Sequence, residues 1–108
     1  MFQNKQNTIV NKISFSGIGL HSGQEVNVNL YPAPENSGII FRRSDIKDKN
    51  NIIPANYRNV TKAQLGTTLS NLDNVSVSTI EHFMAAIWGS RIDNLIIEMD
   101  GEEMPIVD

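Results

Sequence analysis

The chain has no cysteine, and this absence excludes two kinds of site. Disulfide bonds cannot form, and a zinc ion could be held only by His, Asp or Glu. Histidine is scarce as well, since His21 and His82 are the only two in the sequence. Any imidazole ligand that this chain offers to a metal must therefore be one of these residues.

Long apolar runs and clusters of positive charge are also absent. No stretch approaches the roughly 20 apolar residues of a membrane-spanning helix, and the polar start of the chain, residues 1–7, lacks the apolar core of a signal peptide. The net charge is -3, and the basic pair Arg42 and Arg43 is followed closely by Asp45. Because nucleic acids and membrane surfaces are bound by clustered Lys and Arg, we expect a cytoplasmic protein with no nucleic-acid partner and no membrane span.

The hydropathy pattern is that of short strands. A chain of 108 residues, of which 40% are hydrophobic, is large enough for one ordinary core. Apolar residues recur at every second position between clusters of Gly, Pro, Asn and Ser. We predict strands at residues 8–15, 25–30, 39–43, 64–69, 75–77 and 92–99, with the polar stretch 44–59 as a surface loop.

One helix is predicted, from about Thr79 to Trp88. Ser78 has the chemistry of an N-cap and Gly89 that of a C-terminal stop. The apolar residues at helical spacing are Ile80, Phe83, Met84, Ile87 and Trp88. Strands followed by one helix and a further strand indicate an α+β fold, a two-layer sandwich in which a mainly antiparallel sheet has the helix packed on one face.

The start of this helix carries the first candidate for chemistry. Glu81 and His82 lie about 100° apart around the helix axis, so a metal held by His82 could have its water beside Glu81. A carboxylate in that place can take a proton as the water attacks a carbonyl. The spacing alone is unspecific, because Ser78 and Glu81 also fit a capping box without a catalytic role. A lone histidine on a helix is also more often a surface or core residue than a ligand.

A glycine-rich segment, residues 16–23, is the second candidate. Its three glycines permit backbone angles and close approaches that other residues resist, and His21 and Ser22 lie between them. The segment could bind a substrate, although its glycine spacing is not that of a dinucleotide-binding fingerprint. The alternative is a plain hairpin turn that joins the first two strands and leaves His21 exposed to solvent.

Four segments in a definite order complete the pattern. They are Ser16 to Gly23, Pro32 to Arg43, Ser78 to Ala86 and Ile92 to Leu95. Together they resemble the UDP-3-O-acyl-N-acetylglucosamine deacetylases, in which the same motifs follow one another at the same spacing. The ending Glu103 to Asp108 is similar to a family segment that continues into a Gly-Ser-Ala stretch. The resemblance covers nearly the whole chain, and four motifs in register are far more specific than one.

The resemblance implies roles for residues at matching positions. It implies that His82 is a zinc ligand, that Glu81 is the general base, and that His21 assists substrate binding at the mouth of the active site. It also implies that Leu65 lies in a segment lining the site near the sugar. Asp108 matches an aspartate near the active site whose role stays open.

The resemblance further implies a ribosomal protein S5 domain 2-like fold for this chain, and a longer enzyme of two similar α+β domains, each a sheet with helices on one face. Residues 1–108 would be the N-terminal domain, and its partner would be the C-terminal domain of the same protein. That second domain would supply the remaining zinc ligands, a general acid and the passage for the acyl chain. Because one histidine cannot hold zinc against bulk solvent, this chain by itself is expected to be inactive.

The implied reaction is zinc-dependent hydrolysis of the N-acetyl group of UDP-3-O-acyl-N-acetylglucosamine, which gives acetate and the free amine. It would be a step of lipid A biosynthesis in a Gram-negative bacterium. Two alternatives of other classes stay open. One is a non-catalytic binding module of the same fold, in which Glu81 caps the helix and His82 packs against the sheet. The other is an α+β domain for a nucleotide or RNA, although the weak basic charge and the lack of a phosphate-binding loop argue against it.

Overall fold

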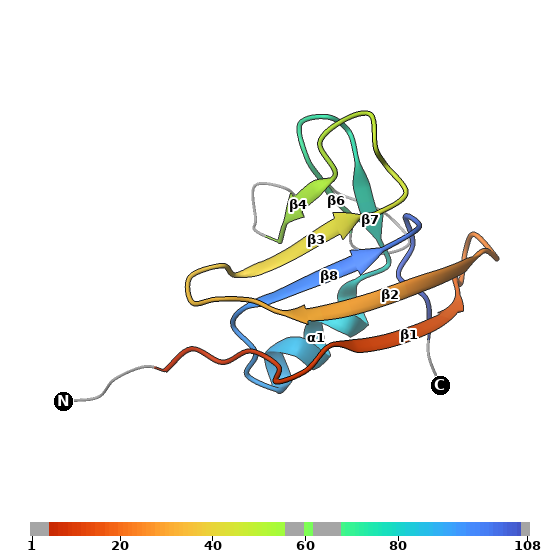
Figure 1. The fold of residues 1–108 in the computed structure, drawn as a ribbon. Coiled ribbons are helices and arrows are strands. Elements are labelled where there is room, and N and C mark those ends of the chain that lie inside the picture. The colour runs from red at the N-terminus through yellow and green to blue at the C-terminus, as the bar shows by residue number, and fades with distance from the viewer. Residues whose placement is uncertain (1–4, 56–59, 62–67, 107–108) are drawn as a thin grey trace.

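A five-stranded sheet forms one face of the molecule (Figure 1). The computed structural model describes residues 5–55, 60–61 and 68–106. The strands lie in the spatial order β1 (Ile13–Ile18), β2 (Glu25–Pro32), β8 (Leu95–Met99), β3 (Ile39–Arg43) and β4 (Ile52–Pro54). Neighbours are antiparallel except β3 and β8, which run parallel. Strand β8 thus inserts between two hairpins and joins them into one sheet.

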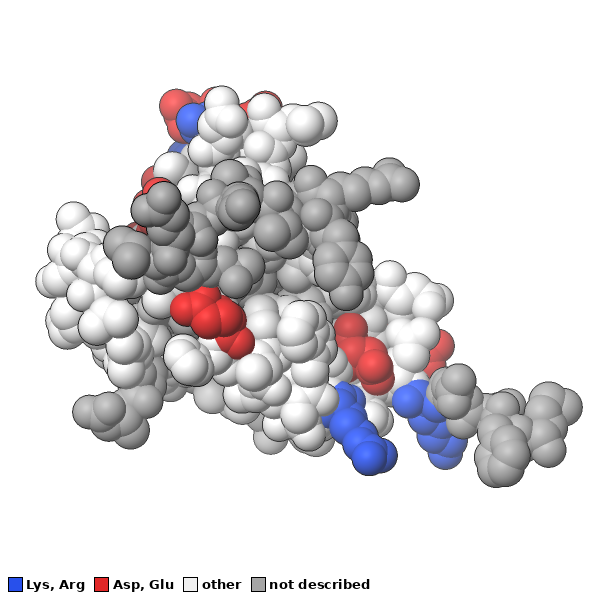
Figure 2. All heavy atoms as spheres, turned by 180° about the vertical axis from the view of Figure 1, so that it is seen from behind, with Lys and Arg blue, Asp and Glu red and all other residues white. Residues whose placement is uncertain are grey.

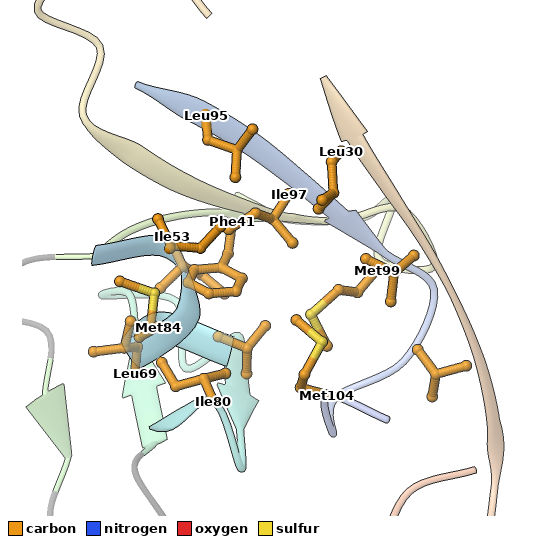
Figure 3. Packing of buried hydrophobic residues seen from close by; sticks show 14 of the residues in the cluster. Leu30, Phe41, Ile53, Leu69, Ile80, Met84, Leu95, Ile97, Met99 and Met104 are labelled. Carbon is orange, nitrogen blue, oxygen red and sulfur yellow. The ribbon is translucent and has the colours of Figure 1, made fainter. Parts of the chain in front are cut away.

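A second layer covers one side of this sheet. It consists of a small antiparallel sheet, β5 (Val60–Thr61), β6 (Thr68–Ser70) and β7 (Ser76–Ser78), and the helix α1 (Glu81–Gly89). Figure 3 shows Leu69, Ile80 and Met84 of this layer pointing toward the larger sheet, where Phe41 and Ile97 meet them. The predicted α+β fold, a two-layer sandwich with a mainly antiparallel sheet and a helix on one face, is confirmed.

Alternation along the strands builds the core between the layers. In β2, Val26, Val28 and Leu30 are buried while Asn27 is exposed, as expected for a strand with one covered face. Strand β8 buries every second residue in the same way. Phe41, at the centre of β3, is completely buried. Burying one such side chain stabilises the fold by about 1.5–3 kcal/mol, so apolar contact between the layers is the main force holding them together.

The helix begins later than predicted, and Ser78 does not cap it. Ile80 occupies the N-cap position without any side-chain cap bond, and Glu81 is the first helical residue. Ser78 is instead the last residue of β7, where its N–H donates to the Glu102 C=O at 2.9 Å. The predicted capping box of Ser78 and Glu81 is therefore wrong, because the Ser78 N–H, which a capping box requires as a donor, already bonds to the Glu102 backbone.

The end of α1 also differs from the prediction, since Gly89 is its last residue and not its stop signal. The helix closes in a Schellman motif, in which the Ile92 N–H donates to the Ile87 C=O and the Arg91 N–H to the Trp88 C=O. Arg91 has a φ of 59°, so it takes the left-handed position that glycine usually fills. Tertiary contacts beyond the helix thus override the local preference for glycine.

The first strand begins later than the predicted range 8–15, because the residues before β1 bond outside the sheet. The Thr8 hydroxyl, for example, accepts a hydrogen bond from the Ala33 N–H at 3.1 Å. Strand β8 likewise begins at Leu95 and not at residue 92, since the Asp93 N–H donates to the Asn7 C=O. Both shifts come from pairing between distant segments that local patterns do not contain.

The predicted loop 44–59 contains a short strand, because Ile52–Pro54 forms β4 at the edge of the larger sheet. Ile53 is completely buried there, which explains why an apolar pair occurs in an otherwise polar stretch. Strand β6 overlaps only the end of the predicted strand 64–69, and residues 64–67 lie outside the described part of the chain. No helix within the described ranges has the length and apolarity that crossing a membrane requires.

Candidate functional site

The two candidate segments of the sequence meet at one surface pocket of about 700 Å³. His21 comes from the loop between β1 and β2, whereas Glu81 and His82 come from the first turn of α1. The remaining lining residues are Phe15, Leu20, Thr79, Phe83, Met104, Pro105 and Ile106. Three of the four predicted site residues therefore lie together, and Leu65 lies outside the described residues.

The loop that carries His21 is a hairpin connection. Strands β1 and β2 pair up to Ile18 and Glu25, and the Gly19 N–H then donates to the Gln24 C=O at 2.9 Å. Gly23 has a φ of 69°, which closes the loop in a conformation that favours glycine. The hairpin interpretation of this segment is thus confirmed, and His21 is exposed at the tip of the hairpin while also lining the pocket.

A C-terminal strap, residues 102–106, connects this hairpin to the start of α1. On one side, the Met104 N–H donates to the Ser78 C=O at 2.9 Å, next to the bond that Ser78 makes with Glu102. On the other side, Ile106 forms a backbone bridge with Ile18 at the end of β1. The strap therefore spans the space between the larger sheet and β7 and lies next to both candidate segments.

Gly17 and Gly19 let the hairpin lie against the strap. A Cβ on Gly17 would come within 2.7 Å of the Ile106 carbonyl oxygen. A Cβ on Gly19 would overlap a carboxylate oxygen of Glu103 and the Ser22 hydroxyl oxygen. Gly17 is thus explained by close approach to the backbone of the strap, and Gly19 by close approach to the side chains of Glu103 and Ser22.

The first turn of α1 presents two different environments. Glu81 is half-buried, at a helix N-terminus where a negative charge is favoured, and His82 is exposed. The residue before the N-cap, Thr79, has a φ of 58°. A β-branched side chain rarely adopts this left-handed conformation, so the turn from β7 into α1 is held in place by its surroundings.

Glu103 is the part of this arrangement that sequence reasoning missed. Its side chain keeps only 5% of its surface exposed, and it accepts hydrogen bonds from both sides of the pocket. The His21 N–H lies 3.1 and 3.0 Å from its two carboxylate oxygens, the Ser22 N–H donates at 2.8 Å, and the Thr79 hydroxyl donates at 2.9 Å. Nothing in the local sequence distinguishes Glu103 from its neighbour Glu102, because its partners are distant in the chain.

The charge state of Glu103 follows from these bonds. Burial raises the pKa of this carboxyl, but the hydrogen bonds from the N–H groups of Ser22 and His21 and from the Thr79 hydroxyl outweigh that effect. The pKa is consequently lowered from its ordinary value of 4.5. Glu103 is therefore an ionised carboxylate at neutral pH, and the groups that bond to it are uncharged donors.

Comparison with known proteins assigns the chain to a family. The family model of UDP-3-O-acyl N-acetylglycosamine deacetylase (LpxC) matches residues 6–108. The chain belongs to this deacetylase family. It is 52% identical over 104 residues to the UDP-3-O-acyl-N-acetylglucosamine deacetylase of Idiomarina loihiensis. The proteins of the same name from Teredinibacter turnerae and Pseudoalteromonas atlantica are 49% and 46% identical over 104 residues.

These alignments cover 96% of this chain but only 34% of each relative. The chain thus spans about a third of the length of the curated deacetylases it matches. The strap lies within the family match, as do both candidate segments of the pocket. The resemblance recognised in the sequence motifs is therefore confirmed at the level of the family.

The pocket that His21, Glu81 and His82 line is mainly apolar. Besides His21, Glu81, His82 and Thr79, its lining consists of aliphatic, aromatic and proline side chains. Figure 2, a view of the side of the larger sheet on which α1 lies, shows charged side chains scattered among many uncharged ones.

The side chains of the pocket supply only some of the ligands that a metal ion needs. His82 is exposed in the pocket beside Glu81, so its imidazole could serve as one ligand to zinc. Within the part of the chain that the structure describes, no three His, Asp or Glu side chains are grouped closely enough to hold a metal ion. A tetrahedral catalytic zinc site has three protein ligands, so further ligands would have to come from residues other than those described.

Proposed function

We propose that this chain is part of an enzyme that hydrolyses the N-acetyl group of UDP-3-O-acyl-N-acetylglucosamine in lipid A biosynthesis, with zinc as cofactor. The observation that supports this proposal best is the single pocket that His21, Glu81 and His82 line in a member of the deacetylase family. The names of the relatives support the choice of substrate. The products would be acetate and the free amine.

In the proposed reaction, Glu81 is the general base. A water molecule adds to the acetyl carbonyl carbon and gives its proton to the Glu81 carboxylate, which lies half-buried beside the pocket. The C–N bond then breaks, the acetyl group leaves as acetate with the water oxygen, and the sugar amine takes up a proton. His21, at the tip of the hairpin, would bind the substrate through its imidazole.

His82 would be one ligand to zinc. Zinc, when bound, would polarise the acetyl carbonyl and acidify water, which is the chemistry that amide hydrolysis needs at neutral pH. The position of His82 one residue after Glu81 would keep the base next to the metal, since adjacent helical side chains point about 100° apart. This assignment gives the two neighbouring residues separate tasks that separate variants can test.

We further propose that residues 1–108 are the N-terminal domain of a two-domain enzyme. The remaining zinc ligands, a general acid and the passage for the acyl chain would come from a C-terminal domain of the same protein. This proposal is supported by the length of the relatives, of which the chain covers about a third. The chain by itself should then show no deacetylase activity.

The binding-module alternative placed Glu81 in a cap at the start of the helix and His82 against the sheet. In a capping box, Glu81 would act together with Ser78. However, Ser78 belongs to β7, and the N-cap residue of the helix is Ile80. His82 was to pack against the sheet, but it is exposed and borders the pocket. The observations on the helix start therefore favour the catalytic interpretation of this pair.

The test uses the full-length protein that carries this chain, in the wild type and in the variants Glu81→Gln and His82→Ala. Loss of a general base typically costs about 100-fold to 10,000-fold in rate. Glu81→Gln should therefore lose turnover by such a factor while it retains zinc, and His82→Ala should lose zinc affinity together with activity. Turnover is measured with the UDP-sugar, and bound zinc by elemental analysis.

Glu102→Gln is the matched control for Glu81→Gln, because Glu102 is an exposed glutamate that does not line the pocket. It should have the turnover and zinc content of the wild type. Normal turnover in both Glu81→Gln and His82→Ala would show that this helix pair is structural and would refute the proposed site.

A further inference from the structure

Glu103 is a buried charged group to which the proposed reaction gives no task. We propose that it is a positioning residue, whose carboxylate clamps the His21 hairpin to the turn that starts α1 and so keeps His21, Glu81 and His82 around one pocket. The inference rests on the proposed function for what the pocket does, but the clamp itself depends on contacts between described residues. Glu103 acts through the groups that it holds and takes no part in bond breaking.

The hydrogen-bond donors to Glu103 come from two separate segments of the chain. The N–H groups of His21 and Ser22 belong to the tip of the hairpin, whereas the Thr79 hydroxyl belongs to the turn between β7 and α1. One carboxylate therefore connects two segments that are separated by more than 50 positions in the sequence. Bonds to an ionised carboxylate are shorter and stronger than bonds between neutral groups, so this connection is rigid.

The backbone conformation of Thr79 also depends on its surroundings. A left-handed φ of 58° is unfavourable for a β-branched residue and persists only where the surroundings hold it. One contact that holds Thr79 is the bond from its hydroxyl to Oε2 of Glu103, at 2.9 Å. Because Thr79 lies between the last residue of β7 and the N-cap Ile80, its backbone angles set the direction in which α1 leaves the sheet.

The hairpin fits closely around the Glu103 carboxylate. A side chain at Gly19 would overlap the Glu103 carboxylate, so the hairpin closes directly over this group. The strap that carries Glu103 is held at both ends by backbone bonds, to Ser78 on one side and to Ile18 on the other. The carboxylate thus has a well-defined position from which it can orient both segments.

Glu103→Gln tests the clamp with the smallest change of shape. A glutamine has one acceptor oxygen where the carboxylate has two. Its NH₂ group would face N–H or O–H groups that now donate to the second carboxylate oxygen, and two donors cannot form a hydrogen bond with each other. In the full-length enzyme we expect kcat/KM for the UDP-sugar to fall at least tenfold while the zinc content stays unchanged. The control Glu102→Gln should stay within twofold of the wild type.

A double-mutant cycle separates positioning from general destabilisation. If Glu103 acts through the His21 hairpin, Glu103→Gln should cost much less activity in a His21→Ala background than in the wild type, because the group that it positions is gone. If the two losses multiply in full, Glu103 acts independently of His21 and the inference is wrong.

Amide hydrogen exchange provides a readout that needs no activity. The N–H groups of His21 and Ser22 should exchange at least tenfold faster in Glu103→Gln than in the wild type, and at the wild-type rate in Glu102→Gln. Unchanged exchange at both amides would overturn the clamp. If the wild type shows no deacetylase activity but these amides lose protection, the proposed function fails and the clamp stands.

A second pair of variants serves if Glu103→Gln does not fold. Thr79→Val keeps the branched shape but removes the hydroxyl donor, while Thr79→Ser keeps the donor. The clamp predicts a clear loss of kcat/KM in Thr79→Val and nearly full activity in Thr79→Ser, with the same zinc content in both. Equal activity of the two variants would contradict a role for the bond between Thr79 and Glu103.

Discussion

Replacement of Gly19 by alanine is expected to destabilise the protein, although the new side chain is a single methyl group. Gly19 is buried in the hairpin, and its φ is not in the left-handed region, so the backbone itself tolerates alanine. The added Cβ would overlap the Glu103 carboxylate and the Ser22 hydroxyl. Neither group can move freely, because Glu103 accepts bonds from the N–H groups of His21 and Ser22 and the Ser22 hydroxyl accepts one from the Gln24 N–H.

The size of the effect follows from two opposing contributions to the free energy of unfolding. Overpacking a well-filled site costs about 1–3 kcal/mol. The loss of glycine entropy in the unfolded chain offsets about 0.4–1 kcal/mol of this cost. The net destabilisation should therefore be about 1–2 kcal/mol. With a urea dependence of about 2 kcal/mol per molar, the midpoint of urea unfolding should fall by about 0.5–1 M.

Gly89→Ala is the matched control, with an effect of the opposite sign. Gly89 is the last residue of α1, and a Cβ there would meet no atom within 4 Å. Alanine in a helix is about 0.5–1 kcal/mol more favourable than glycine, so this variant should unfold at a higher urea concentration than the wild type. Both variants are compared by far-UV circular dichroism. A midpoint for Gly19→Ala at or above that of the wild type would refute the packing argument.

Two further predictions concern the core and the response to acid. Phe41→Ala should destabilise the protein by about 3–5 kcal/mol, because Phe41 is completely buried between the layers, and the same urea titration measures this loss. Burial raises the pKa of Glu98, but hydrogen bonds from Arg42 and Asn29 and the charge of Arg42 outweigh that effect and hold the pKa below the ordinary value of 4.5. The stabilisation from Glu98 is therefore complete above pH 4.5 and is lost as the pH falls through the lower folded-state pKa, so Glu98→Gln should flatten the acid side of the stability profile. A profile with an unchanged acid side would contradict this assignment.

Local patterns in the sequence were sufficient for part of the larger sheet. The alternation of apolar and polar residues predicted β2 closely, because its buried residues alternate with more exposed ones, and the extended pattern of residues 39–43 coincides with β3. The same reasoning misplaced the ends of β1 and β8, where single hydrogen bonds to distant segments decide whether the ladder continues. It also passed over β4, whose two isoleucines are too short a run to stand out in a polar stretch.

The candidate site could likewise be predicted from the sequence only in part. Glu81, His82 and His21 could be selected from the sequence, because their residue types and motifs resemble the deacetylase family. Their shared pocket could not be derived from spacing, since the hairpin and the helix are about 60 positions apart and only packing brings them together. The roles of these residues and of Leu65 remain predictions for the experiments above.

By itself, the sequence determined the family, the α+β class, most of the strands and the identity of the pocket histidines and Glu81. Only the tertiary structure decided that Ser78 ends a strand, that Thr79 is held in a left-handed conformation, and that Glu103 bonds to the His21 hairpin. The physical reason is that these features depend on partners far away in the chain. The bond between His21 and Glu103 spans 82 positions, and no local propensity encodes a contact over that separation.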